Sequence, residues 1–229
     1  MHTANLLLRS LSASDVAAIQ PYLKSVNLEH QKILFDTGDI INVVYFPTSA
    51  IISLVVSLST GEMIEAAMVG KDGVVGASSA LDGKISLSRA IVLLAGDGFT
   101  CEAAALKGAA LQSQTLLSKL IRYEQTVYAQ AQQSTACMAT HDVEARLCRW
   151  LLRARDLSGT DTLLFTQEFL AEMLGVKRTS VTTVAHTLQR AGMIKYSRGK
   201  IQILDLAALQ DTACECYETV NSHYQTLLG

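Results

Sequence analysis

Short apolar stretches alternate with turn residues through the first half of the chain. The apolar runs occupy Lys32–Phe35, Ile40–Phe46, Ile51–Leu58, Met63–Val69 and Ser88–Leu94. Segments rich in Gly and Asp separate or follow them, among them Asp36-Thr37-Gly38-Asp39, Lys71-Asp72-Gly73 and Gly96-Asp97-Gly98. Short strands at regular spacing with such turns are typical of an antiparallel sandwich or barrel. We therefore predict a jelly-roll-like antiparallel β-roll between Glu29 and about Ala105.

Helical segments flank the predicted roll. Before it, Ser12 or Ser14 can cap a short helix that runs to Ile19 and ends at Pro21. After it, residues 102 to about 139 contain no Pro and, beyond the first turns, no Gly. This segment is rich in Ala, Leu and Gln, which predicts one long helix. A helix of about 30 residues spans about 45 Å.

One side of the predicted long helix carries an apolar seam. Spacings of four and three residues align Leu116, Leu120, Tyr123 and Val127. A small β domain alone is too short to bury a helix of this length. We therefore predict that these four residues form a dimer seam against the same helix of a second copy. Packing of the seam against its own domain remains the alternative.

The chain changes character again near residue 140. Asp142 is a good N-cap for a new helix, which Ser158-Gly159-Thr160-Asp161 would close. One face of that helix is apolar, and Arg146, Arg149 and Arg153 lie on another. These features divide the chain into a sensor roll (residues 1–110), a dimerisation helix (111–139) and a C-terminal domain (140–229).

Residues 166–188 fit a helix-turn-helix. Thr166 can cap the first helix, and Ala171 supplies the small side chain that two steeply crossing helices need. Gly175 suits a turn position with positive φ. Val181 and Val184 point inward from the second helix. A β-like pair, Met193–Tyr196 and Lys200–Leu204, follows as a wing with a Gly-containing turn.

The outward residues of this motif are cations and hydroxyls. The whole chain has 19 Lys and Arg against 21 Asp and Glu, for a net charge of −2. Between Met173 and Leu204, however, there are six basic residues and no acidic one. A locally basic face with a helix that fits the major groove predicts binding to double-stranded DNA. The predicted DNA-binding residues are Thr166, Gln167, Lys177, Arg178, Thr179, Ser180, Thr182, Thr183, Arg198 and Lys200.

The order of a β-roll, a long helix and a winged helix-turn-helix resembles the Crp/Fnr family of bacterial transcription regulators. The residues that carry the resemblance are Ile33-Leu34-Phe35-x-x-Gly38-Asp39, Val43-Val44-Tyr45-Phe46-Pro47, Asp142-x-x-x-Arg146-Leu147, Thr166-Gln167-Glu168 through Val184, and Gly192-Met193-Ile194. The resemblance covers nearly the whole chain. It implies a cyclic-nucleotide-binding type of roll, a homodimer joined by the long helix, a two-fold-related operator and contact with RNA polymerase.

The effector site departs from the family pattern. Cyclic-nucleotide binders of this family use a Gly-Glu pair for the ribose and an Arg for the cyclic phosphate. The matching residues here are Gly76, Ala77 and Ser78, then Ser88 with Arg89 one place along. Ala77 lacks the carboxylate, and a shift of one residue turns a strand side chain to the other face. We expect no cAMP binding; another small molecule or nucleotide, or no ligand at all, are the alternatives.

Other chemistries are less well supported by the sequence. The five cysteines form no C-x-x-C pair and no metal-type Cys/His array, and none precedes residue 101 where the family's iron–sulfur sensors place theirs. A cupin-type enzyme needs several His residues on facing strands, but only His30 lies between residues 3 and 140. No apolar run reaches the length of a membrane span. We therefore expect a cytoplasmic regulator that is not an enzyme, needs no metal and does not bind membranes.

Overall fold

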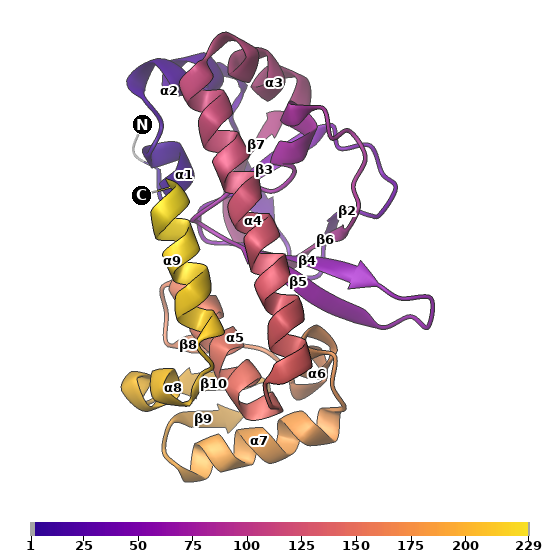
Figure 1. The fold of residues 1–229 in the computed structure, drawn as a ribbon, viewed down its shortest axis with the longest axis vertical. Coiled ribbons are helices and arrows are strands. Elements are labelled where there is room, and N and C mark those ends of the chain that lie inside the picture. Colours follow the sequence, from indigo (N-terminus) through magenta and orange to yellow (C-terminus); the bar gives the residue numbers. More distant parts are fainter. Residues whose placement is uncertain (1–2, 229) are drawn as a thin grey trace.

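The computed structural model describes residues 3–228 and places a β-roll, a long central helix and a C-terminal domain along one axis (Figure 1). The long helix α4 runs beside the roll and ends at the C-terminal domain. This arrangement confirms the predicted α+β fold class.

The roll consists of two antiparallel sheets. One has the strand order β1-β7-β3 and the other β2-β6-β4-β5. Their bounds are β1 Lys24–Leu28, β2 Ile33–Phe35, β3 Val43–Pro47, β4 Ile51–Ser57, β5 Met63–Val69, β6 Arg89–Leu94 and β7 Gly96–Glu102. Side chains from both sheets, such as Val44 on β3 and Ile52 on β4, are fully buried in a shared core. A short 3-10 helix, η2 (Ala77–Leu81), crosses between β5 and β6.

The prediction that Gly96-Asp97-Gly98 forms a turn is wrong, because these residues begin strand β7. A Cβ atom on Gly96 would lie 2.5 Å from the backbone nitrogen of Ala50. A Cβ atom on Gly98 would lie 2.9 Å from the carbonyl oxygen of Phe46. The glycines therefore permit close backbone approach inside the sheet, which is the other common reason for Gly in a strand.

The N-terminal helices α1 (Leu6–Arg9) and α2 (Ala13–Ile19) lie on the roll. Ser12 caps α2 by accepting a hydrogen bond from the backbone N–H of Asp15, as predicted. A 3-10 turn, η1 (Gln20–Tyr22), contains Pro21 and leads into β1. The buried Asp15 carboxylate accepts hydrogen bonds from Ser113 and Thr115, so the N-terminal segment is tied to the start of α4.

The predicted single long helix is two helices, α3 (Ala103–Gln112) and α4 (Gln114–Thr140). Ser113 breaks them apart with an extended backbone at φ −133° and ψ 110°. Its hydroxyl accepts a hydrogen bond from the backbone N–H of Leu116 and so caps α4. Serine is a strong N-cap, and this local preference wins over the continuous helical pattern.

The predicted dimer seam faces the chain's own core. Leu116, Leu120 and Tyr123 have exposed fractions of 1%, 2% and 0%, and Val127 is half-buried against the same core. They pack on the roll and on the C-terminal helix α9 (Cys216–Leu228), whose Tyr224 meets Tyr123 edge to face at 6.5 Å. Leu116, Leu120 and Tyr123 are therefore covered by their own chain, which is the alternative to a seam against a second copy. The side of α4 that stays exposed carries Ile121 and Tyr128 instead.

The C-terminal domain combines helices with one small sheet of order β8-β10-β9. Its elements are α5 Val143–Ser158, β8 Thr162–Leu164, α6 Gln167–Leu174, α7 Arg178–Arg190, β9 Ile194–Ser197, β10 Lys200–Ile203 and α8 Leu206–Thr212, followed by α9. Asp142 caps α5 by accepting from the N–H of Ala145, and Gly159 ends it with φ 71°. Both boundaries were predicted from residue type.

Two arginines of α5 connect this helix to other parts of the chain. Arg146 and Arg153 are buried. Arg146 donates to the backbone oxygen of Leu174, and Arg153 forms an ion pair of 2.6 Å with Asp72 of the roll. Helix α5 therefore joins the C-terminal domain to the roll. Within residues 3–228, no helix has the length and apolar character needed to span a membrane.

Candidate nucleic-acid interface

Helices α6 and α7 form the predicted helix-turn-helix. Thr166 caps α6 by accepting a hydrogen bond of 3.1 Å from the N–H of Phe169. Gly175 ends α6 with φ 60° and ψ 43°, the left-handed conformation that glycine adopts without strain. Ala171 and Val181 are buried between the helices. The local signals in the sequence therefore position α7 on the outside of the domain (Figure 1).

The outward face of α7 is rich in hydroxyl groups and begins with two cations. Lys177, Arg178, Thr179 and Thr183 are exposed, while Ser180 and Thr182 are half-buried. The same face continues with His186, Thr187 and Arg190, which are not among the predicted DNA-binding residues. The signal for them was present, since they follow Thr179 and Thr183 at helical spacing.

Three threonine hydroxyls of α7, those of Thr182, Thr183 and Thr187, already act as donors. Thr182 lies near the backbone oxygen of Arg178 at 3.0 Å and near Oε1 of Gln167 at 2.7 Å. Thr183 donates to the oxygen of Thr179 at 3.0 Å. A hydroxyl that donates its hydrogen inside the helix presents only acceptor lone pairs and a methyl group outward. Such a surface suits amino groups and thymine methyl groups on base edges.

Among residues 3–228, the Arg178 guanidinium pairs with one carboxylate. Its Nε atom lies 3.5 Å from Oε2 of Glu168 on α6, and both side chains are mostly exposed. An exposed pair of this kind contributes about 0–1 kcal/mol, so a phosphate or a guanine can displace the carboxylate at small cost.

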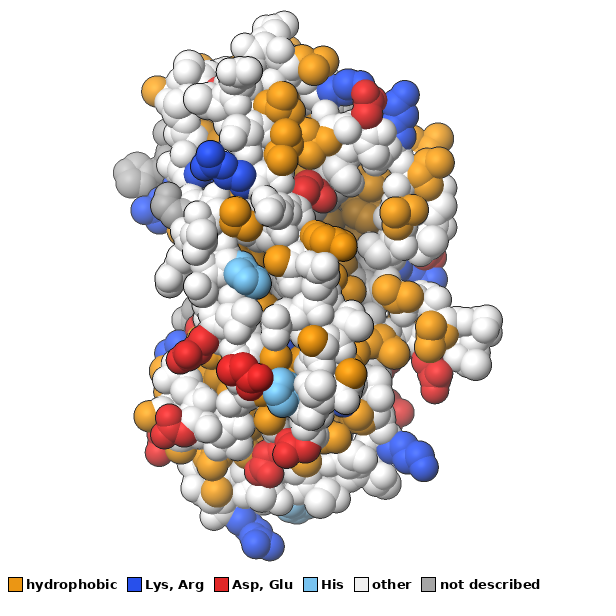
Figure 2. All heavy atoms as spheres, viewed as in Figure 1, with side chains coloured by type: hydrophobic (Ala, Val, Ile, Leu, Met, Phe, Trp, Pro, Cys, Tyr) orange, Lys and Arg blue, Asp and Glu red, His pale blue; other side chains and the backbone are white. Residues whose placement is uncertain are grey.

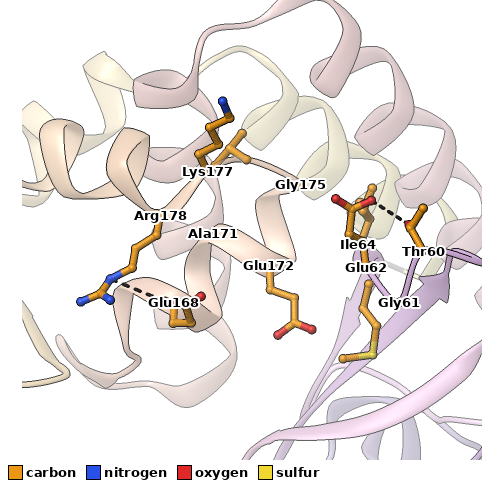
Figure 3. Close-up of a pocket in the computed structure, with 12 residues that line it drawn as sticks. Thr60, Gly61, Glu62, Ile64, Glu168, Ala171, Glu172, Gly175, Lys177 and Arg178 are labelled. Carbon is orange, nitrogen blue, oxygen red and sulfur yellow. Dashed lines mark hydrogen bonds and ion pairs between the residues drawn. The ribbon is translucent and has the colours of Figure 1, made fainter.

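Beside Arg178 lies a cleft of about 740 Å³ between the β4–β5 hairpin and α6 (Figure 3). Glu62, Glu168 and Glu172 line it together with Lys177 and Arg178. In Figure 3 the Arg178 side chain points away from the hairpin, and the Glu172 side chain points toward it. Three carboxylates make this cleft a poor site for a phosphate group. The outer side of α7, which carries no acidic residue, suits a polyanion better than this cleft does.

The wing is a two-residue hairpin between β9 and β10. Arg198 and Gly199 have φ values of 49° and 79°, and Ser197 pairs with Lys200. Two successive positive φ values define a type I′ turn, in which Arg is an unusual first residue. A Cβ on Gly199 would lie 3.6 Å from the methyl group of Thr166, so the wing tip lies at the start of α6. Arg198 and Lys200 are exposed there.

The predicted effector residues lie around a second cavity of about 410 Å³, between the roll and α4. Gly76, Ser78 and Ser88 line it, but Ala77 does not and is fully buried in the core. Arg89 does not line it either, because its guanidinium is paired with Asp36 at 2.6 Å. Ala77 and Arg89, which the sequence assigned to the effector pocket, therefore lie outside the lining of this cavity.

The side chains that line this cavity are not suited to binding an anion. Among the described residues, its lining contains no Lys, Arg or His. The polar groups are serines and Glu124 of α4, and burial raises the pKa of the Glu124 carboxyl even though a backbone hydrogen bond from Ser78 opposes this. Most other lining side chains are apolar, such as Leu54 and Val127, and Tyr128 adds an aromatic ring with a hydroxyl. Figure 2 shows hydrophobic side chains around the hollow beside α4.

Comparison with known proteins supports both halves of the fold. Residues 145–212, which include the helix-turn-helix and the wing, match the model of the Crp-like helix-turn-helix domain. A search of curated protein sequences finds no match.

Solved structures match over most of the chain. A transcriptional regulator assigned to the Crp/Fnr family from Eubacterium rectale has 21% identity and a TM-score of 0.69, covering 91% of this chain and 98% of that one. FixK2 from Bradyrhizobium japonicum has 15% identity and a TM-score of 0.73, covering 84% and 98%. A CRP-family regulator from Thermus thermophilus has 23% identity and a TM-score of 0.68, covering 82% and 96%.

These findings confirm the resemblance to the Crp/Fnr family. The chain carries a Crp-like helix-turn-helix domain within a fold shared with Crp/Fnr transcription regulators.

Proposed function

We propose that this protein is a homodimeric transcription regulator that binds specific DNA sequences through α7. The observation that carries the proposal is the outer face of α7, where Lys177 and Arg178 precede a row of exposed hydroxyl residues without any acidic residue on the helix. The wing tip adds Arg198 and Lys200. With a net charge of −2 for the whole chain, attraction to DNA has to come from this face.

Within this proposal, base reading and backbone binding are divided between residues. Arg178 contacts a guanine edge, and Thr179 and Thr183 contact neighbouring bases through methyl groups and lone pairs. Contacts to phosphates position the domain on the duplex without reading its sequence. The residues assigned to phosphate contacts or to support of α7 are Thr166, Gln167, Lys177, Ser180, Thr182, Arg198 and Lys200.

The exposed side of α4 is the proposed dimer interface, in place of the buried seam. Ile121 and Tyr128 lie seven residues apart and are 50% and 65% exposed, and the half-buried Leu117 precedes Ile121 by four residues. Figure 2 shows hydrophobic side chains along this part of the surface. Such spacing suits a helix pair, and a dimer would hold its two α7 helices about 34 Å apart. Contact with RNA polymerase is part of the same proposal.

The proposal also assigns a role to each part of the chain. We assign residues 1–110 to a sensor roll, 111–139 to dimerisation and 140–229 to DNA binding. The cavity between the roll and α4 is the effector site of this proposal. Its apolar and serine-rich lining favours an uncharged small molecule over a cyclic nucleotide. A regulator that works without any ligand is the second candidate.

Selection of binding sites from a random double-stranded DNA library tests the proposed function. We expect enrichment of a two-fold-related sequence whose half-sites are separated by about one helical turn. The affinity for this sequence should fall steeply with salt. Recovery of unenriched DNA at low salt would overturn the proposal.

A further inference from the structure

Four side chains from two distant parts of the sequence meet at the C-terminal end of α4. Cys137 lies in the last turn of the helix and His141 directly follows it, while Cys214 and Cys216 lie between α8 and the start of α9. Their ligand atoms all lie within 4.8 Å of one another. The prediction of no metal-type Cys/His array is therefore wrong, because the array forms only when α9 folds back on α4.

The geometry of this cluster fits one tetrahedral ion. The Sγ atoms of Cys137 and Cys214 are 3.5 Å apart, and Sγ of Cys216 is 3.6 Å from Nδ1 of His141. Zinc bonds of about 2.3 Å to sulfur and about 2.0–2.1 Å to nitrogen give tetrahedral edges of about 3.8 Å and about 3.6 Å. Small side-chain shifts therefore bring all four atoms to bonding distance.

Neighbouring residues supply the outer contacts that metal ligands need. The Nε2 atom of His141 lies 3.2 Å from Oε1 of Glu215, which leaves Nδ1 directed toward Cys216. Metal-binding histidines are usually held in this way by a carboxylate on the other ring nitrogen. The amide Nε2 of Gln133 donates to Sγ of Cys216 at 3.0 Å, which would stabilise a thiolate.

We propose that Cys137, His141, Cys214 and Cys216 bind one zinc ion. A set of three thiolates and one imidazole is typical of closed structural zinc sites and selects against the hard cations Mg²⁺ and Ca²⁺. Binding takes the protons off the three thiols and releases them to solvent, and no redox step is involved. The three cysteines are buried and His141 is partly exposed, so the ion has a route in past the imidazole.

The ion would tie together parts of the chain that meet at the junction of α4 and α5. His141 and Asp142 separate α4 from α5, and Cys214 and Cys216 follow the wing and α8. A bound ion therefore cross-links the end of the proposed dimerisation helix to the C-terminal end of the DNA-binding domain. This inference does not depend on DNA binding, because it concerns metal content alone.

Two other arrangements of these four residues, an iron–sulfur cluster and a disulfide, need different distances between the ligand atoms. An iron–sulfur cluster places iron and sulfide between its ligands, so it needs its cysteines further apart than a single ion does. A Cys137–Cys214 disulfide would need the two sulfurs to close from 3.5 Å to about 2.05 Å and would remove two of the four ligands. The compact set of four donors favours the single ion.

Metal analysis of the full-length protein, purified without oxygen and with zinc present, tests the proposal. We expect one zinc per chain in the wild type and loss of that zinc in Cys214→Ser. Cys101→Ser is the matched control, since Cys101 is also a buried free cysteine but lies on β7. Exchange of zinc for Co²⁺ should produce thiolate-to-cobalt charge-transfer absorption in the wild type and in Cys101→Ser only.

A second variant keeps the test valid if Cys214→Ser does not fold. The Glu215 side chain is 73% exposed, and Glu215→Gln should weaken zinc binding by roughly 10–100-fold without unfolding the domain. The proposal is overturned if the reduced wild type binds no zinc, or if zinc content is the same in Cys214→Ser. Iron with sulfide, or a Cys137–Cys214 disulfide under reducing conditions, would overturn it as well.

Discussion

The indole N–H of Trp150 donates a hydrogen bond of 2.8 Å to Oε1 of Glu65, and this bond joins the C-terminal domain to the roll. The other carboxylate oxygen of Glu65 accepts from the hydroxyl of Ser53 at 2.6 Å. All three residues are buried. Buried polar groups are costly when left without partners. If the two domains separate, the Trp150–Glu65 hydrogen bond has to be exposed to water or replaced. This bond therefore helps to fix the position of the C-terminal domain, and of α7 within it, relative to the roll.

Glu65 should make stability depend on pH. Burial raises the pKa of its carboxyl to about 7, even though Ser53, Arg149, Trp150 and Arg153 favour the charged form. In the unfolded chain the pKa returns to about 4.5, so the folded state binds an extra proton between these values. The free energy of unfolding should then fall as the pH rises from about 4.5 to about 7, by on the order of 3 kcal/mol.

Denaturant unfolding of Glu65→Gln at several pH values measures this contribution. The variant should match the wild type near pH 5 and be the more stable of the two near pH 8, because Gln stays neutral. Glu62→Gln is the control, since Glu62 lies exposed on the same hairpin. Parallel curves for wild type and Glu65→Gln across this range would contradict the assignment.

The contribution of the Arg198 charge to DNA binding can be tested without disturbing the wing turn. Arg198 has φ 49° in a type I′ turn, a position where Asn is favoured. Arg198→Asn should therefore be at least as stable as the wild type. Its DNA affinity should fall equally for all sequences, and the slope of log affinity against log salt should decrease by about 1.

Fluorescence anisotropy over a salt series measures both effects of Arg198→Asn. Arg122→Asn is the matched control, because Arg122 is exposed on α4 and far along the chain from the wing. An unchanged salt slope in Arg198→Asn would remove the wing tip from the interface.

The proposed dimer face predicts a change of oligomeric state. Ile121→Glu should yield monomers in sedimentation experiments, because the charge would have to be buried between two helices. Leu111→Glu alters a side chain that is 70% exposed on α3, and it should remain dimeric. If Ile121→Glu is still a dimer, the interface lies on a different surface.

The effector cavity predicts indifference to cAMP. A ligand present at 100 times its Kd stabilises a protein by about 2.7 kcal/mol, which is easily seen as a higher Tm. No such rise is expected with cAMP, since no cation of the described chain lines the cavity and Arg89 is held by Asp36. A saturable rise that disappears in Arg89→Ala would show that Arg89 binds the phosphate after all.

Features that depend on near neighbours were predictable from the sequence. The caps at Ser12, Asp142 and Thr166 and the turn at Gly175 all lie where residue type indicated. Each depends on contacts within three or four residues, so local preference is enough to identify it. The winged helix-turn-helix, which is built from such signals, was therefore found correctly.

Features that depend on distant partners were missed. Cys137 meets Cys214 across 77 positions, and Arg153 meets Asp72 across 81. The seam on α4 was assigned to a second copy because nothing in the sequence showed that α9 would cover it. In the same way, Gly96 and Gly98 look like a turn until the neighbouring backbone is in place. Tertiary contact decides all four cases.

The central claim is that α7 reads DNA sequence and that Arg178 reads one base pair in each half-site. Selection of DNA sites with the wild type and with Arg178→Ala, side by side, tests it most directly. We predict that the variant loses preference at one pair of symmetric positions and binds the wild-type site about 1–3 kcal/mol more weakly. The same preferences in both proteins, or no preference in either, would contradict the claim.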